Sequence, residues 1–209
     1  MGSHVSLIGA LLLMVFLGLS LSASEAARPY CRFDGKLVVS NLVKELSAAG
    51  NYSTLLAALK KTDLDDDLPA LFNCYEATLF APTDAAFEEL SSDARSAIKD
   101  AKVLREVVLL HVVQKKMTAA DLAALPQGKQ LKAAAGGCKA RLVKVSPRGA
   151  QPVEVEAMDG PQGASLVAPD VISLRVVQVH GVDDVILPKS LQKGDGDSLK
   201  PGKCLAWRA

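Results

Sequence analysis

The first half of the chain spaces its apolar residues as helices do. Between Val39 and Leu46 they fall at i, i+3, i+4 and i+7, the spacing that lines one face of an α-helix. Asp34 can cap this helix at its start, and Gly50 can end it. A second short helix is predicted from about Ser53.

A brief apolar run in the middle of the chain predicts a buried strand. It extends from Thr78 to Ala81, and either Thr83 or Asp84 can cap a following helix over Ala85 to Leu90. The aspartate-rich stretch Thr62 to Pro69, which precedes the strand, is interpreted as a loop that enters a short turn.

From about Leu131 the pattern changes to the alternation of strands. Val153 to Ala157 alternates apolar residues with two glutamates, and Leu142 to Val145 is a plausible partner strand. Further β-rich stretches occur at Ser165 to Val167 and at Leu174 to Val179. Helical period followed by strand period predicts a single α+β domain, with N-terminal short helices packed on C-terminal strands.

The domain is expected between two segments that lie outside it. Residues 1–27 resemble a cleavable secretion signal, because the apolar run Leu7 to Leu21 is followed by small residues. A membrane anchor is the rival interpretation, but a spanning helix needs about 20 apolar residues and this run has 15. The domain is predicted over residues 35–191 and a tail over 192–209, and the tail lacks the hydrophobic end that a lipid-anchor signal needs.

The charge balance argues against a nucleic-acid partner. The whole chain has a formal net charge of +1, and loss of Glu25 with the signal would raise it to about +2. Proteins that neutralise phosphates usually carry clustered Lys and Arg and a high pI. We therefore expect an extracellular protein without a nucleic-acid partner or a membrane anchor.

The four cysteines predict disulfides rather than a zinc site. They are even in number and far apart, whereas zinc sites use close pairs. Three connectivities are open, and a bridge between the two ends of the domain is favoured; the candidates are Cys31, Cys74, Cys138 and Cys204.

The motifs of common catalytic and metal sites are missing from the sequence. Asp63, Asp65 and Asp67 imitate the start of a calcium loop, but Leu68 and Cys74 stand where that loop requires Gly and Glu. No nucleophile elbow, zinc-protease pair, phosphate loop or dinucleotide fingerprint occurs. No catalytic residue, metal or cofactor is therefore predicted.

Two histidines remain after the predicted signal is removed. His111 completes an apolar helical stripe with Leu104, Val107 and Val108, so it is predicted to be a core histidine whose nitrogens find partners. The alternative is a small extracellular metal-dependent or hydrolytic enzyme that uses His111 and His180.

Three blocks of the sequence resemble the signature blocks of the fasciclin domain, an extracellular adhesion module. They are Thr78 to Phe87, Leu109 to Val113 and Val176 to Pro188, in the order and at the spacing of that family. The resemblance covers roughly Leu37 to Leu191 and is greatest to plant fasciclin-like proteins.

The resemblance implies a fold of short helices on a wedge of strands and a function without catalysis. Its expected partners are extracellular proteins or cell-surface and cell-wall polysaccharides. It also implies that His111 is bonded to Thr83 or Asp84. In animal relatives two motifs are linked to integrin binding, and the matching positions here are Leu110, which replaces the family's tyrosine, and Asp170, Val171 and Ile172.

One glycosylation motif is present. Asn51, Tyr52 and Ser53 form an N-x-S sequon at the predicted junction of the first two helices, where exposure is plausible. A secreted chain is therefore predicted to carry a glycan on Asn51.

Overall fold

The computed structural model describes residues 33–136, 141–149, 151–158, 160, 163–188 and 191. Contacts between Cα atoms divide the chain into Met1–Cys31 and Arg32–Ala209, and every described residue belongs to the second unit. The predicted signal and tail lie outside the described residues. Within the described part of the chain, no helix is long and apolar enough to cross a membrane.

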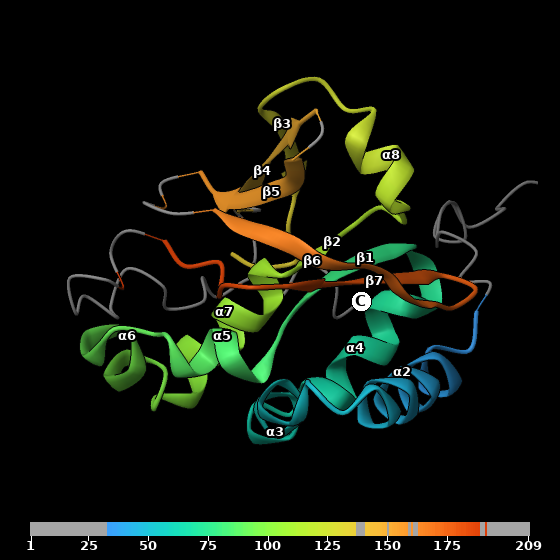
Figure 1. Ribbon diagram of the computed structural model, residues 1–209. Helices are drawn as coiled ribbons and strands as arrows, with labels where there is room; N and C mark the ends of the chain where they lie inside the picture. The colour runs from blue at the N-terminus through green and yellow to red at the C-terminus, as the bar shows by residue number, and fades with distance from the viewer. Residues whose placement is uncertain are drawn as a thin grey trace, which may run out of the picture. The chain divides into compact units, whose positions relative to one another are not determined.

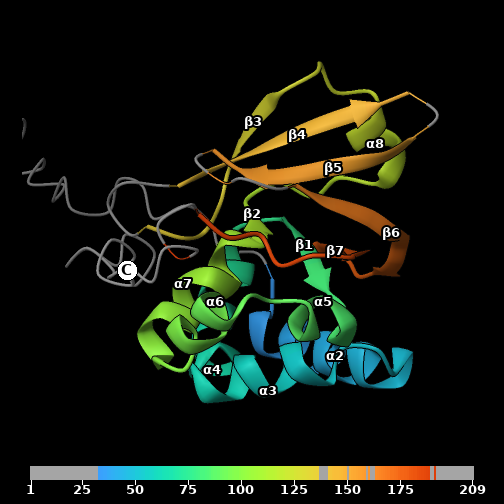
Figure 2. The same cartoon turned by 60° about the vertical axis from the view of Figure 1, so that its left-hand side comes forward.

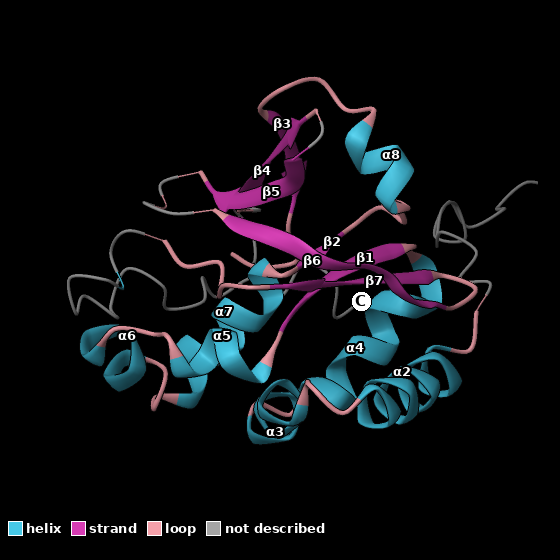
Figure 3. Ribbon diagram, in the orientation of Figure 1, coloured by secondary structure: helices cyan, strands magenta, loops and turns pink. Residues whose placement is uncertain are grey.

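The chain is an α+β domain whose helices precede most of its strands, as predicted (Figures 1 and 3). The helices are α2 (Gly35–Ala49), α3 (Ser53–Lys61), α4 (Leu64–Cys74), α5 (Asp84–Glu88), α6 (Ser92–Ala97), α7 (Ala101–Leu110) and α8 (Ala119–Ala123). The strands are β1 (Ala77–Pro82), β2 (Val112–Val113), β3 (Lys129–Lys132), β4 (Leu142–Arg148), β5 (Gln151–Ala157), β6 (Ala164–Ser173) and β7 (Val177–Val182).

Helix α2 confirms the prediction from apolar spacing. Val39, Leu42 and Leu46 are buried, and the Asp34 side chain accepts a hydrogen bond from a backbone N–H of the first turn. The helix ends at Gly50, whose φ of 81° is the left-handed conformation that glycine adopts without steric cost.

Helix α4 corrects the interpretation of residues 62–69 as a loop. Three aspartates occupy its first turn, where carboxylates interact favourably with the N-terminal end of the helix dipole. Leu64, Leu68, Leu71 and Phe72 are all buried along one face. This burial outweighs the helix-breaking effect of Pro69, which lies inside the helix.

The seven strands form one mixed sheet in the order β2-β1-β7-β6-β5-β4-β3. The β1–β7 pair is parallel and the other pairs are antiparallel. The predicted hairpin is confirmed, because β4 pairs with β5 and Val145 lies opposite Val155. A bridge between Val113 and Ala133 links the two ends of the sheet, with main-chain hydrogen bonds from Ala134 N to Val112 O and from Gln114 N to Lys132 O, and gives the sheet a barrel-like curvature.

Helices α2, α3 and α4 lie on one side of strands β1 and β7, and strands β3 to β5 with α8 lie on the other (Figures 1 and 2). Strand β6 joins the two halves, because Ala164 and Ser165 pair with β5 while Leu166 to Ser173 follow β7. The sequence predicted only a short strand here; Pro169 and two bulges interrupt the alternation along β6.

Candidate functional site

The residues that follow β1 connect three segments of the chain. Thr83 caps α5 by accepting a hydrogen bond from Ala86 N at 3.3 Å. Asp84 instead caps α3, since its carboxylate accepts bonds from Ser53 N, Ser53 Oγ and Thr54 N at 3.1, 2.9 and 2.7 Å. Burial opposes ionisation of Asp84, but these bonds outweigh it and hold the pKa below its ordinary value.

His111 is buried at the end of α7, as predicted from its place in the apolar stripe. Its Nδ1 lies 2.8 Å from Val107 O and its Nε2 accepts a hydrogen bond from Ile186 N at 2.9 Å. A carbonyl can only accept, so Nδ1 carries the proton and the ring is neutral. Burial lowers the pKa of His111 to about 4, although the bond to Val107 partly opposes that shift.

The prediction that the His111 side chain is bonded to Thr83 or Asp84 is therefore wrong. Both ring nitrogens are used, one within α7 and one on the segment that follows β7. Thr83 and Asp84 cap helices instead. The His111 side chain thus anchors the third sequence block, at Ile186, while its main-chain carbonyl accepts a hydrogen bond from Phe80 N of the first block at 2.9 Å.

His180 is fully buried in β7 and makes a second, separate cluster. Its Nε2 donates to Met117 O at 2.9 Å, and its Nδ1 accepts from Asp170 N at 3.0 Å. The ring is therefore neutral with the proton on Nε2, and the 3.7 Å contact between Nδ1 and the Asp170 carboxylate is not an ion pair. Burial lowers the pKa of His180, and the ring stacks on Phe80.

The segment that joins β2 to α8 is held against the sheet by side chains of three strands. We call residues 114–119 the strap. Thr78 Oγ donates to Lys115 O and accepts from Met117 N, at 2.7 and 2.9 Å. The Asp170 carboxylate accepts from Ala119 N and from Gln178 Nε2, at 3.1 and 2.7 Å. Together with His180, these side chains make the strap a continuation of the folded core.

Of the four residues that the resemblance implied for partner binding, two are buried and two are exposed. Leu110 and Ile172 are buried, with 1% and 6% exposure, so they cannot form a contact surface. The Asp170 side chain is 40% exposed and Val171 is 36% exposed. Asp170 has a φ of 51°, a conformation that aspartate tolerates better than most residues.

Sequence reasoning missed Val167, which is 53% exposed on the same strand. We call Val167, Asp170 and Val171 the β6 edge. Within the described residues, β5 pairs with β6 at Ala164 and Ser165, so the β6 edge lies beyond that pairing. The signal was present in the sequence as an apolar run through Pro169, but apolar residues in a strand are normally assigned to the core.

The ring nitrogens of the two histidines offer nothing to a metal or a substrate. All four are hydrogen-bonded to main-chain atoms, and the two rings share no partner. In the described part of the chain, no group of three or more His, Cys, Asp or Glu side chains could hold a metal ion.

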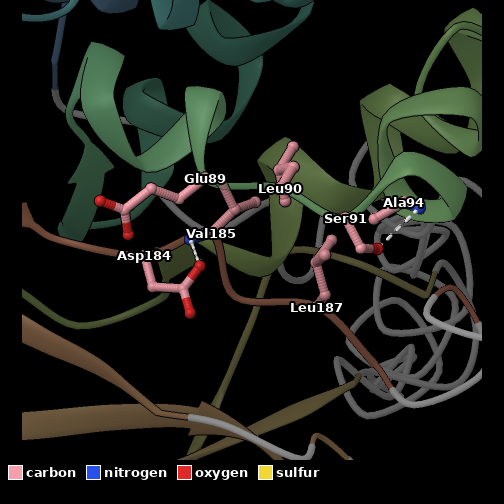
Figure 4. Close-up of a pocket in the computed structure, with 7 residues that line it drawn as sticks. All are labelled: Glu89, Leu90, Ser91, Ala94, Asp184, Val185 and Leu187. Atoms are coloured by element: carbon pink, nitrogen blue, oxygen red, sulfur yellow. Dashed lines mark hydrogen bonds between the residues drawn. The ribbon is translucent and has the colours of Figure 1, made fainter.

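A surface pocket of about 390 Å³ lies between the α5–α6 region and the segment after β7 (Figure 4). Glu89 and Asp184 lie toward one end of it and Ser91 and Leu187 toward the other (Figure 4). Burial and the neighbouring carboxylates of Asp183 and Glu89 raise the pKa of Asp184. The Ser91 hydroxyl caps α6 by accepting a hydrogen bond from Ala94 N at 3.2 Å.

A model of the fasciclin domain matches residues 50–188, which is more than half of the chain. The chain belongs to the fasciclin family. All three sequence blocks that carried the resemblance lie within the matched range. The α+β arrangement described above is thus the fasciclin fold.

Two curated proteins and one solved structure show the range of the similarity. Fasciclin-like arabinogalactan protein 11 of Arabidopsis thaliana is 26% identical over 91% of this chain and 73% of its own length. The uncharacterized protein sll1735 of Synechocystis sp. is 28% identical over 70% of this chain and 97% of its own length.

The solved structure is a pair of fasciclin domains from the insect cell adhesion molecule Fasciclin I. It superposes with a TM-score of 0.51 at 16% identity, over 66% of this chain and 46% of that one. The match thus spans about half of that chain, and the likeness concerns the fold alone.

Cys74 is the one cysteine among the described residues, and it takes part in a disulfide bond. Cys31, Cys138 and Cys204 lie outside the described residues. The pairing stays a prediction.

Proposed function

We propose that this fasciclin domain is a secreted, non-catalytic adhesion module that contacts extracellular proteins or cell-wall polysaccharides through its β6 edge. The observation that carries the proposal is that the histidine rings are fully hydrogen-bonded inside the domain, whereas apolar side chains are exposed on β6. Every histidine nitrogen in the described region is bonded to the main chain, whereas Val167, Asp170 and Val171 are exposed on β6. Exposed apolar residues beside a polar rim are typical of protein contact sites.

Secretion is supported by the apolar run at residues 7–21 and by the family's occurrence in adhesion proteins. Expression of the whole chain in a eukaryotic host, followed by N-terminal sequencing of the protein in the medium, tests this part. The expected mature N-terminus lies near residue 28. Retention of the chain in the cell membrane would contradict it and favour the anchor interpretation.

The contact surface is tested by substitutions that leave the core unchanged. Val167→Ser and Val171→Ser remove exposed apolar groups, and Leu37→Ser is the matched control because Leu37 is 58% exposed on α2. Purified variants are applied to a panel of extracellular matrix proteins and cell-wall polysaccharides. We expect the β6 variants to lose about tenfold in affinity for the partner that the wild type binds, which corresponds to about 1.4 kcal/mol. Equal loss in the Leu37 variant, or no loss in either β6 variant, would reject this surface.

The alternative is a small enzyme built on His111 and His180. It requires at least one ring nitrogen to leave its main-chain partner. A stoichiometric metal in the purified protein, lost in both His111→Ala and His180→Ala, would favour that alternative. We expect no such metal.

A further inference from the structure

The only N-x-S/T sequon of the chain lies at an exposed turn between α2 and α3. The chain has three asparagines, at positions 41, 51 and 73, and only Asn51 is followed by a residue other than proline and then by Ser or Thr. Asn51 is exposed. A Cβ on the preceding Gly50 would meet no atom within 4 Å, so the backbone of the turn is not covered at this position.

The folded structure fixes the backbone of the sequon while its asparagine stays at the surface. Tyr52 is buried, and its hydroxyl lies so close to Gly181 that a Cβ there would come within 2.4 Å of it. The Ser53 hydroxyl donates to the Asp84 carboxylate, and Asn51 O accepts from Asp84 N at 2.9 Å. The third position of the sequon, whose hydroxyl the acceptor motif requires, is therefore occupied once Asp84 has docked.

We propose that Asn51 carries an N-linked glycan and that it is added before Asp84 docks on the sequon. The donor is an oligosaccharide linked to a polyprenyl diphosphate. A bond forms between Asn51 Nδ2 and the anomeric carbon of the sugar, while the bond from that carbon to the diphosphate oxygen breaks. The diphosphate leaves with the electron pair, and a base of the transferase takes the proton from Nδ2.

The order of events follows from the order of synthesis. Asp84 is translated after the sequon, so the nascent chain presents Ser53 free of its later partner. Folding then engages the hydroxyl through a bond of 2.9 Å. The sequon should consequently be accessible to the transferase in the nascent chain and inaccessible to it in the folded domain.

The glycan would lie on the helical side of the molecule. The α2–α3 junction lies on one side of strands β1 and β7, and strands β3 to β5 with α8 lie on the other side (Figures 1 and 2).

The test is the intact mass of the secreted chain before and after treatment with a peptide N-glycosidase. The inference rests on the secretion part of the proposed function, so a second version replaces residues 1–27 with an established secretion signal, and Asn51 is tested even if the native N-terminus fails. We expect one oligosaccharide, absent in Asn51→Gln and in Ser53→Ala and retained in Ser53→Thr. Asn41→Gln is the matched control, since Asn41 is exposed on α2 outside any sequon. A secreted protein whose mass equals that of the bare chain overturns the proposal.

The timing is tested with the folded, unglycosylated whole chain from a bacterial host. It is incubated with solubilised transferase and lipid-linked donor beside a peptide that spans residues 48–56. We expect the peptide to be modified at least tenfold faster than the folded wild type, and Asp84→Ala to narrow that difference. Equal rates for the peptide and the folded wild type would overturn the proposed order while leaving the site itself to the mass measurement.

Discussion

The two buried histidines do the same kind of work with opposite tautomers. His111 carries its proton on Nδ1 and His180 carries it on Nε2, because each ring donates to a carbonyl and accepts from a backbone N–H. His111 joins α7 to the segment after β7, whereas His180 joins β7 to the strap and to β6. A histidine in an apolar environment thus serves as a two-ended connector between main-chain segments, and its surroundings decide which nitrogen holds the proton.

The first prediction concerns removal of each histidine side chain. His111→Ala should lower the free energy of unfolding by about 3 kcal/mol or more, because it leaves a cavity and two main-chain groups without their partner. His180→Ala should cost less, about 2 kcal/mol, because water can reach its half-exposed neighbour Asp170. Denaturant unfolding measures both changes, with Lys102→Ala on the exposed face of α7 as the control. If His180→Ala lowered the free energy of unfolding as much as His111→Ala or more, access of water to the unpaired groups would not explain the difference between the two sites.

The second prediction concerns acid. The pKa of His111 is about 4 in the folded protein and about 6.5 in the unfolded chain, so the unfolded chain binds more protons between these values. The contribution of His111 to the free energy of unfolding should therefore be fully present above about pH 6.5. The free energy of unfolding should fall by about 3 kcal/mol as the pH drops toward 4. The lowered pKa of His180 acts in the same direction.

The dependence on each ring is separated by substitution. The decline between pH 6.5 and 4 should be shallower in His111→Phe, which fills a similar space without titrating. Thermal melts at a series of pH values supply the slope. A slope that is the same in the variant and the wild type would assign the acid sensitivity to other groups.

The third prediction concerns the Asp170 carboxylate, which lies in the same cluster as His180. Asp170→Ala removes the acceptor for Ala119 N and Gln178 Nε2 and should cost about 1 to 2 kcal/mol. Asp170→Asn keeps one side-chain oxygen and tolerates the positive φ, so it should cost less than about 1 kcal/mol. Urea unfolding of the two variants side by side checks the order, and the reverse order would mean that the charge matters more than the hydrogen bonds.

The smallest expected effect is at the β6 edge itself. Val167→Ser and Val171→Ser should change stability by no more than about 0.5 kcal/mol, because both side chains already contact solvent. Melting temperatures measured beside the binding experiment test this. A large loss of stability would show that these valines pack against the domain and would undo their use as surface probes.

Local patterns predicted much of this architecture because they depend on near neighbours. The apolar spacing of α2, its Asp34 cap and its glycine end were all readable from the sequence, as was the β4–β5 hairpin. Helix α4 was missed because burial of four apolar residues overcame a proline and a run of aspartates that suggested a loop. Strand β6 was predicted too short because Pro169 and two bulges break the alternation on which such predictions depend.

By itself the sequence determined that this is a helix-then-strand domain, that His111 is buried, and which blocks place the chain among fasciclin proteins. Only the tertiary structure decided what those residues touch. His111 meets Ile186, 75 positions away, and Asp84 caps a helix that begins about 30 positions before it. Likewise, of the four residues implied in binding, it buried Leu110 and Ile172 and exposed Asp170 and Val171. Periodicity records which side of an element faces the core, but a bond between distant segments depends on how the chain is brought together and leaves no local repeat to read.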